Sequence, residues 1–341
     1  MATLALDAMG SDLGPTATVN GAAKASRHPE GPRVILVGDA EVLSSFLGEV
    51  EHDPDKIEIL HAPETVAMDE SPRAALAAKP DCSILTAAHL VAEGGADALV
   101  SAGNTGAVTM ACAKVFERLP GVTRCALGAV FPTERRRGEK DDPFSLILDA
   151  GLTLDVTAED LVGFAIMGAA YASRISSNDR PRVALLSNGS EGHKGPQAIV
   201  EAHRILSGLE CLDFIGNIEG MDIPRGTADV VVTGGFTGNI VLKMLEGIAD
   251  TVVRLGRYAM DKSIMYKAGL ALLSPAVKKL RRVTDWEQYG GAPVLGFDHL
   301  CIKGHGRSSE RAIKNALVVA QTAVQSDMVG VIRAGLREAG R

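Results

Sequence analysis

Cysteine and aromatic residues are scarce in this chain. Aromatic residues make up 4% of the 341 positions, with a single Trp, and there are five cysteines. The cysteines are widely spaced, without a C-x-x-C pair and without a nearby His at metal-ligand spacing: Cys82, Cys112, Cys125, Cys211 and Cys301. This pattern excludes a disulfide framework and a structural zinc site, so we expect reduced, mostly buried thiols and no metal.

Long hydrophobic runs are also missing. No apolar run approaches the roughly 18 residues that a membrane span needs. Residues 1–10 (MATLALDAMG) pass directly into a strand-like pattern, without a basic segment or a small-residue cleavage site. We therefore expect a cytoplasmic protein.

Positive charge is in deficit overall. The chain has 35 basic and 42 acidic residues and a formal net charge of -7, which argues against general nucleic-acid binding. Two local clusters depart from this balance: residues 135–140, with three consecutive Arg and one Lys, and residues 278–282, with two Lys and two Arg. Most such clusters are solvated faces.

Small and aliphatic residues are plentiful, and their order predicts the fold class. Short runs rich in Val, Ile and Leu alternate with amphipathic stretches of helix length. The predicted strands are Leu4–Leu6, Val34–Val37, Ile57–Leu60, Ala98–Val100, Leu127–Phe131, Leu146–Leu148, Val183–Leu186, Leu212–Ile215, Val230–Val232 and Leu300–Ile302. The predicted helices include Ser83–Glu93, Gly106–Arg118, Ala158–Arg174, Gln197–Leu206, Gly238–Met260 and Ser309–Gln325. Because parallel strands require crossover helices, this alternation predicts an α/β fold with a mostly parallel sheet.

The length is compatible with one α/β unit or with two lobes. The charged stretch Thr133–Asp142 is the best candidate for a boundary. A division there would join residues 1–140 to residues 300–341 in one lobe and leave residues 141–299 in the other.

Small polar residues follow five of the predicted strands. These segments are residues 7–12, 101–106, 187–195, 233–239 and 303–309. In open α/β sheets ligands bind beyond the carboxyl ends of the strands, and each segment here precedes a helix whose free N–H groups favour an anion. Any one loop is compatible with an ordinary turn or helix cap, but the five together predict a converging anion site.

Familiar catalytic motifs are absent. The sequence has no G-x-x-x-x-G-K-[ST], G-x-S-x-G or H-E-x-x-H motif. Residues 304–309 resemble a dinucleotide fingerprint but lack the following strand and acidic partner, so we expect no nicotinamide. The remaining chemistry is attack by a bound anion, such as inorganic phosphate on a thioester. Lys194, between glycines, suits phosphate as a point charge, although an exposed surface lysine is the alternative.

Five motifs in order along the whole chain carry a resemblance to a known family. They are DAMGSD (7–12), SAGNTGA (101–107), GFTGN (235–239), YGGAP (289–293) and the His305–Gly306 loop. Together they resemble the bacterial phosphate acyltransferases of the PlsX family. The resemblance implies a Rossmann-like three-layer α/β/α sandwich, related to phosphotransacetylases and to isopropylmalate dehydrogenase-type folds.

The same resemblance implies an activity and partners. The enzyme would convert acyl-[acyl-carrier-protein] and inorganic phosphate to acyl phosphate and free carrier protein, in bacterial phospholipid synthesis. It would need no cofactor, form a homodimer and contact an anionic membrane peripherally, with a glycerol-3-phosphate acyltransferase acting downstream. The alternatives are a short-chain acyl-CoA phosphotransacylase and a non-catalytic scaffold for membrane or carrier protein.

The chain departs from the family pattern at several places. Leu152 and Thr153 replace the last two residues of a D-x-G-A-N motif, Ala77 and Ala78 stand where Arg is frequent, and Cys82 replaces a usual Ser. The middle of the loop before Lys194 is also altered. These changes bear on acyl-chain preference and phosphate affinity more than on the reaction.

The resemblance assigns roles residue by residue. Lys194 would supply charge for phosphate, Asn239 an amide donor, and His305 a proton for the leaving thiolate or a structural contact. Asp7 would orient Lys194 or a backbone donor. The full set predicted to bind phosphate or substrate is Asp7, Gly10, Asn104, Thr105, Gly106, Asn188, Gly238, Gly306 and Ser308.

Residues 262–282 combine apolar side chains with six basic ones, crowded at one end. Such a segment packs on a core, forms a dimer contact or lies at a membrane interface. The family associates peripherally with membranes through this region, so we expect Leu270, Leu272 and Leu273 to contact lipid. The basic end could alternatively dock an acidic carrier protein.

Overall fold

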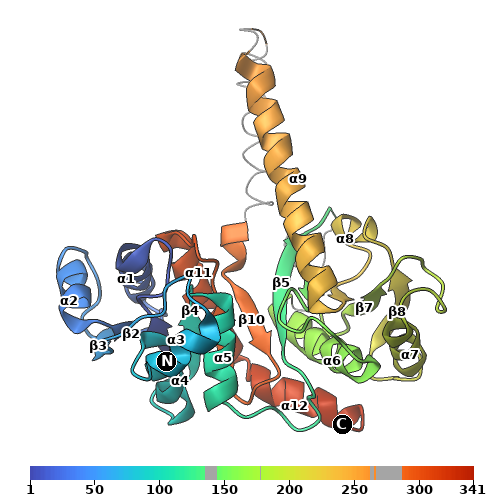
Figure 1. Ribbon diagram of the computed structural model, residues 1–341, viewed down its shortest axis with the longest axis horizontal. Helices are drawn as coiled ribbons and strands as arrows, with labels where there is room; N and C mark the ends of the chain where they lie inside the picture. Colours follow the sequence, from blue (N-terminus) through green and yellow to red (C-terminus); the bar gives the residue numbers. More distant parts are fainter. Residues whose placement is uncertain (135–143, 177, 262–264, 266–285) are drawn as a thin grey trace.

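A computed structural model describes residues 1–134, 144–176, 178–261, 265 and 286–341. Its strands form one 11-stranded sheet in the order β3-β2-β1-β4-β11-β10-β5-β6-β9-β7-β8 (Figure 1). The strands are β1 (Thr3–Asp7), β2 (Arg33–Gly38), β3 (Ile57–His61), β4 (Ala98–Ser101), β5 (Ala126–Pro132), β6 (Phe144–Leu148), β7 (Arg182–Leu186), β8 (Asp213–Ile218), β9 (Val230–Val232), β10 (Ala292–Leu295) and β11 (Leu300–Lys303).

The sheet has two parallel halves that run in opposite directions. Strands β3, β2, β1, β4 and β11 are mutually parallel, and so are β6, β9, β7 and β8. Between them, β10 is antiparallel to both β11 and β5, and β5 is antiparallel to β6. The carboxyl ends of the two halves therefore lie at opposite edges of the sheet. The expectation that all five polar loops meet at one edge is wrong for this reason.

Helices cover both faces of the sheet, which gives the expected three-layer α/β/α sandwich. One face packs on α1 (Gly14–Ser26), α2 (Ala40–Gly48), α6 (Ala158–Ile175), α7 (Gln197–Leu206), α11 (Glu310–Gln325) and α12 (Met328–Glu338). The other face packs on α3 (Pro72–Ala78), α4 (Ser83–Ala92), α5 (Thr105–Val115), α8 (Asp222–Arg225) and the start of α9 (Gly235–Asp261). A 3-10 turn, η1 (Trp286–Tyr289), precedes β10.

The predicted strands and helices are all present within a few residues, but β10 escaped prediction. Its four residues include Pro293, and two glycines precede it, a composition typical of a turn. Gly290 and Gly291 have φ of 71° and 115°, in the region that favours glycine. A Cβ on Gly290 would lie 2.4 Å from the carbonyl oxygen of Asn315, so this turn packs directly against α11.

Helix α6 shows how local sequence sets an element at the centre of the fold. Thr157 and Asp160 form a reciprocal capping box at its N-terminus. Thirteen residues of the helix, from Asp160 to Ala172, are buried because the sheet, α7 and α12 surround it. A helix apolar on every side is stable only in such an enclosed position.

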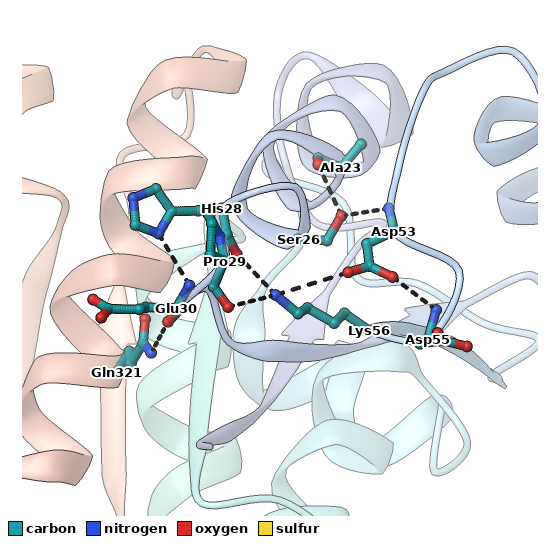
Figure 2. A network of polar contacts seen from close by, with 9 residues as sticks. All are labelled: Ala23, Ser26, His28, Pro29, Glu30, Asp53, Asp55, Lys56 and Gln321. Carbon is teal, nitrogen blue, oxygen red and sulfur yellow. Dashed lines mark hydrogen bonds and ion pairs between the residues drawn. The ribbon is translucent and has the colours of Figure 1, made fainter.

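A polar network fixes the turn between α1 and β2 (Figure 2). Lys56 Nζ donates to the carbonyl oxygens of His28 and Pro29 at 2.8 and 3.0 Å. Gln321 Nε2 of α11 donates to the carbonyl oxygen of Glu30 at 2.6 Å. These bonds satisfy backbone carbonyls that belong to no helix or strand, and they tie the C-terminal helix pair to the first βαβ unit.

Several sequence predictions lie outside the described residues. These are the basic clusters at 135–140 and 278–282 and the lipid-contacting Leu270, Leu272 and Leu273. The division into two lobes stays a prediction. None of the helices in the described part of the chain is both long and apolar enough to cross a bilayer.

Candidate active site

A cavity of about 440 Å³ lies on the sheet face that carries α5 and α9. Its lining includes Ala129 of β5 and Ala292 of β10, whose small side chains leave room between the two helices. Thr105 contributes from the start of α5, and residues 303–306 and 308 contribute from the end of β11 and the loop beyond. Helix α9 contributes Asn239, Leu242, Lys243 and Glu246.

Helix α9 brings the two halves of the sheet to this one cavity. It begins beside the end of β6, contacts β6 and β5, and then projects from the body (Figure 1). A Cβ on Gly238 would lie 1.9 Å from the carbonyl oxygen of Asp149, so this first turn needs a glycine. The close approach places Asn239 in the same cavity as His305, although the carboxyl ends of β9 and β11 lie at opposite edges.

The loop after β11 is tied to the loop after β1. The N–H of Asp12 donates to the carbonyl oxygen of Gly306 at 2.9 Å. A Cβ on Gly306 would lie 2.5 Å from Asp12 Oδ2 and 2.6 Å from Met68 Cε, so the glycine lets these two side chains approach the loop closely. Ser309 caps α11 by accepting the N–H of Ala312 at 3.3 Å. The positive end of α11 therefore follows directly after the cavity wall.

His305 is neutral at neutral pH. Desolvation at the cavity wall, together with the positive charges of Lys243, Lys303 and Arg307, lowers the pKa of its imidazole. Its Nδ1 accepts the N–H of Arg307 at 3.2 Å. The neutral ring therefore carries its proton on Nε2, where it can donate a hydrogen bond to a ligand oxygen.

Asp7 is buried and does not line the cavity. Its carboxylate accepts the hydroxyls of Ser83 and Ser101, both at 2.7 Å, and Ser101 Oγ in turn accepts the N–H of Gly103 at 3.0 Å. Burial raises the pKa of Asp7. Of the two predicted roles of Asp7, the structure supports the contact with a backbone donor, because the backbone N–H groups of Met9 and Gly10 also hydrogen-bond to its carboxylate. Lys194 is not among the hydrogen-bond partners of Asp7.

Asn104 caps α5 and has no amide group left for phosphate. Its Oδ1 accepts the N–H of Ala107 at 3.2 Å, while Nδ2 donates to the carbonyl oxygen of Met68 at 2.9 Å. Gly10 and Gly106 permit close packing, since a Cβ there would lie 2.7 Å from Asp7 Oδ2 and 2.6 Å from Pro72 Cγ, respectively. These residues shape the loops, and Thr105 is the member of the group that reaches the cavity.

Lys194 and Asn188 lie apart from the other predicted residues. They belong to the loop after β7, are exposed, and line neither of the two cavities described for this structure. Ser187 Oγ donates to the carbonyl oxygen of Lys194 at 3.0 Å, which closes the loop on itself. The predicted residues that do meet in the cavity are Thr105, Asn239, His305, Gly306 and Ser308.

Lys303 is a cavity residue that the sequence analysis missed. It is the last residue of β11, lines the cavity and exposes only 6% of its surface. Burial lowers the pKa of its ammonium to about 8. The alternation of β11 gave a usable signal: Cys301 packs in the core on the α4–α5 face, so Lys303, two residues later, lies on that inward face.

Asp149 holds the loop that carries the altered family motif. It is fully buried, and its carboxylate accepts the N–H groups of Leu127, Gly151, Leu152 and Thr153 at distances from 2.5 to 3.1 Å. Burial outweighs these bonds and raises the pKa of the carboxyl. The loop keeps its shape with Leu152 and Thr153 because the bonds use backbone groups.

A second cavity of about 450 Å³ lies farther along α5. Its lining is Thr109, Ala113, Phe116, Arg118, Thr123, Arg124, Cys125, Leu152, Thr153 and Phe297. It shares α5 and the 150–153 loop with the first cavity. Burial raises the pKa of Cys125 to about 12, so the one thiol in its lining is protonated.

All five cysteines are free thiols, and four of them are buried, as predicted. Within the described ranges, no group of three His, Cys, Asp or Glu side chains is arranged to hold a metal ion.

Comparison with known proteins gives a consistent result. The model of a family described as "Fatty acid synthesis protein" matches residues 2–330. A phosphate acyltransferase from Myxococcus xanthus is 42% identical over 335 residues, covering 96% of this chain and 93% of the relative. One from Endomicrobium trichonymphae is 39% identical over 342 residues and covers 98% of each chain.

Among solved structures, a phosphotransacetylase from Streptococcus pyogenes superposes with a TM-score of 0.60 at 19% identity and covers 94% of each chain. This likeness confirms the predicted fold class. The family model matches nearly the whole chain, and relatives named phosphate acyltransferase are about 40% identical to it, so this chain belongs to the fatty acid synthesis protein family.

Proposed function

We propose that this protein transfers the acyl group of acyl-[acyl-carrier-protein] to inorganic phosphate. The observation that carries the proposal is the cavity between α5 and α9, where Asn239, His305 and Ser308 face a common space beside the N-terminus of α11. Donors of this kind suit a phosphate and a carbonyl oxygen that gains negative charge. The phosphate acyltransferase relatives support the same assignment.

The reaction needs no covalent bond between the protein and its substrate. A phosphate oxygen attacks the thioester carbonyl carbon, the carbonyl oxygen becomes an oxyanion, and the C–S bond then breaks to give acyl phosphate and a thiolate. A thiol of pKa near 8.5 leaves readily as the thiolate without a protein acid. The thiolate then takes its proton from water. Asn239 would donate its amide N–H to phosphate or to the oxyanion, and neutral His305 would donate from Nε2.

The thiols support direct attack by phosphate. Burial raises the pKa of Cys82, Cys125 and Cys211, and hydrogen bonding to Cys301 raises that of Cys112, so these groups are poor nucleophiles. We therefore expect no acyl-enzyme. Mass spectrometry of the protein quenched during turnover would detect one, and a stable acyl adduct on Cys or Ser would contradict direct attack.

The decisive experiment mixes the purified protein with palmitoyl-carrier protein and inorganic phosphate and measures acyl phosphate. Saturation with short acyl-CoA and not with the carrier-bound substrate would indicate a phosphotransacylase of small thioesters. Absence of phosphate-dependent thioester cleavage with either substrate would favour the scaffold. Asn239→Ala should lower the rate by about 10²-fold, the scale for a lost preorganised donor.

Lys194 can bind the phosphate in this cavity only if a conformational change or a second subunit brings its loop there. Lys194→Ala tests this directly. A loss of rate comparable to that of Asn239→Ala would mean that Lys194 reaches the substrate, whereas unchanged kinetics would remove it from the site.

We also propose that the protein is a homodimer, with α9 at the interface. Five apolar residues recur every four positions along this helix and are exposed in the single chain: Phe236, Ile240, Met244, Ile248 and Val252. A repeated apolar stripe on a projecting helix is a common dimer contact. Ile248→Glu should give monomers in light scattering, and Ala249→Glu, an exposed neighbour outside the stripe, should not.

Peripheral membrane contact through residues 262–282 remains a proposal from the sequence. Each buried Leu would contribute roughly 1.5–3 kcal/mol and each nearby Lys or Arg about 1 kcal/mol against anionic lipid, so binding would be reversible and salt-sensitive. Replacing Leu272 and Leu273 by Glu should abolish co-sedimentation with anionic liposomes and leave activity on soluble carrier protein unchanged. Unfolding or dissociation of that variant would instead indicate a core or dimer contact.

A further inference from the structure

The cavity contains one buried cation that the fold does not neutralise. Three of its lining residues can carry positive charge: Lys243, Lys303 and His305. Lys243 is exposed and pairs with Glu246 at 3.0 Å, and His305 is neutral. Lys303 is buried, and among the residues that the structure describes no carboxylate forms an ion pair with it.

The surroundings of Lys303 leave its charge uncompensated. Its Nζ donates to the carbonyl oxygen of the next residue, Gly304. The nearest acidic groups are Asp7, Asp12 and the Cys301 thiol, and their combined effect is smaller than that of burial, because the pKa of Lys303 falls to about 8. Both oxygens of Asp7 are already engaged by serine hydroxyls.

A buried ammonium of this kind is unfavourable until an anion accompanies it. The open side of Lys303 is the cavity, where Asn239, Ser308 and the loop before α11 supply neutral donors. A charged donor beside several neutral ones is the arrangement that binds phosphate, since Lys acts as a point charge and the neutral donors fix orientation.

We propose that Lys303 is the residue that binds the phosphate nucleophile in this cavity. This inference rests on the proposed function, because it takes the bound anion to be the substrate phosphate. It assigns to Lys303 the part that the sequence analysis gave to Lys194. Because free Lys303 loses its proton near pH 8, phosphate affinity should fall as pH rises above 8, with Asp7, Asp12, Cys301 and His305 as the other titratable groups nearby.

Phosphate binding is measured directly by the rise in thermal unfolding temperature with added inorganic phosphate, in the absence of any acyl substrate. The wild-type protein and Lys114→Met, an exposed lysine of α5, should be stabilised equally. Lys303→Met, which keeps the length of the side chain, should lose about 10-fold or more in phosphate affinity, the scale for a hydrogen bond to a charged group. Lys303→Gln serves as the second variant if the first does not fold.

Steady-state kinetics give the second readout. In Lys303→Met the KM for phosphate should rise about 10-fold or more, while the KM for acyl-carrier protein stays within about 2-fold. Wild-type phosphate affinity in both Lys303 variants overturns the proposal. If phosphate protects the wild type through Lys303 but no acyl phosphate forms, the anion site stands and the proposed function fails.

Discussion

Replacing Gly238 by Ala tests how α9 joins the two halves of the site. The new Cβ would lie 1.9 Å from the carbonyl oxygen of Asp149, a backbone atom that cannot rotate away. The first turn of α9 would have to move by about 1.5 Å to reach the 3.4 Å at which ordinary van der Waals contact begins. We expect a loss of about 1–3 kcal/mol in the free energy of unfolding, the usual cost of overpacking, and a loss of about 10²-fold in rate, because Asn239 moves with the turn.

Gly163→Ala in α6 is the matched control. Its Cβ would meet only Arg341 Nη1, at an ordinary 3.7 Å, and it replaces glycine inside a helix. This variant should gain about 0.5–1 kcal/mol and keep full activity. Urea unfolding and the acyl phosphate assay measure both variants. If Gly238→Ala matched the wild type in stability and rate, the close approach of α9 to the Asp149 loop would not determine the position of Asn239.

Three further predictions concern Asp149, Lys303 and His305. Asp149→Asn should lose about 2 kcal/mol in urea unfolding, because its NH₂ would face backbone N–H groups that need an acceptor; wild-type stability would contradict this role. Lys303 has a folded-state pKa of about 8 and an unfolded value of 10.5, so the wild type should gain about 3 kcal/mol of stability between pH 8 and 10.5 relative to Lys303→Met, and parallel curves would refute the shift. His305→Asn should leave the shape of the rate profile above neutral pH unchanged, because desolvation lowers the pKa of His305. Loss of an ionisation from that part of the profile would instead indicate a titrating catalytic histidine.

Local sequence predicted most elements of the fold. Short runs rich in Val, Ile and Leu identified ten strands, and a short polar loop before a helix identified both the loop after β11 and the start of α9. It failed at β10, where Pro293 and two glycines look like a turn. Because β10 is antiparallel to both β11 and β5, the direction of the two halves reverses at the antiparallel pair β5–β6, and local sequence does not predict that pairing.

Local sequence predicted only some residues of the site. Asn239, His305 and Thr105 could be identified from motifs, because a loop that binds an anion has a recognisable local composition. The alternation of β11 places Lys303 on the inward face, but only the tertiary structure shows that this lysine is buried in a cavity wall. Asn104 and Asp7 have the composition of ligand-binding residues, but they hold the loops that other residues use.

The sequence by itself determined the α/β class, the family and the loops rich in small polar residues, because these depend on residues close together in the chain. The tertiary structure decided which loops share a cavity, which lysine lines that cavity together with Asn239, and that Lys194 lies outside it. Those outcomes depend on the antiparallel pairing of β5 with β6 and on the path of α9 across these two strands. The strand pairing and the path of α9 are both determined by contacts between residues far apart in the chain, and local periodicity does not predict such contacts.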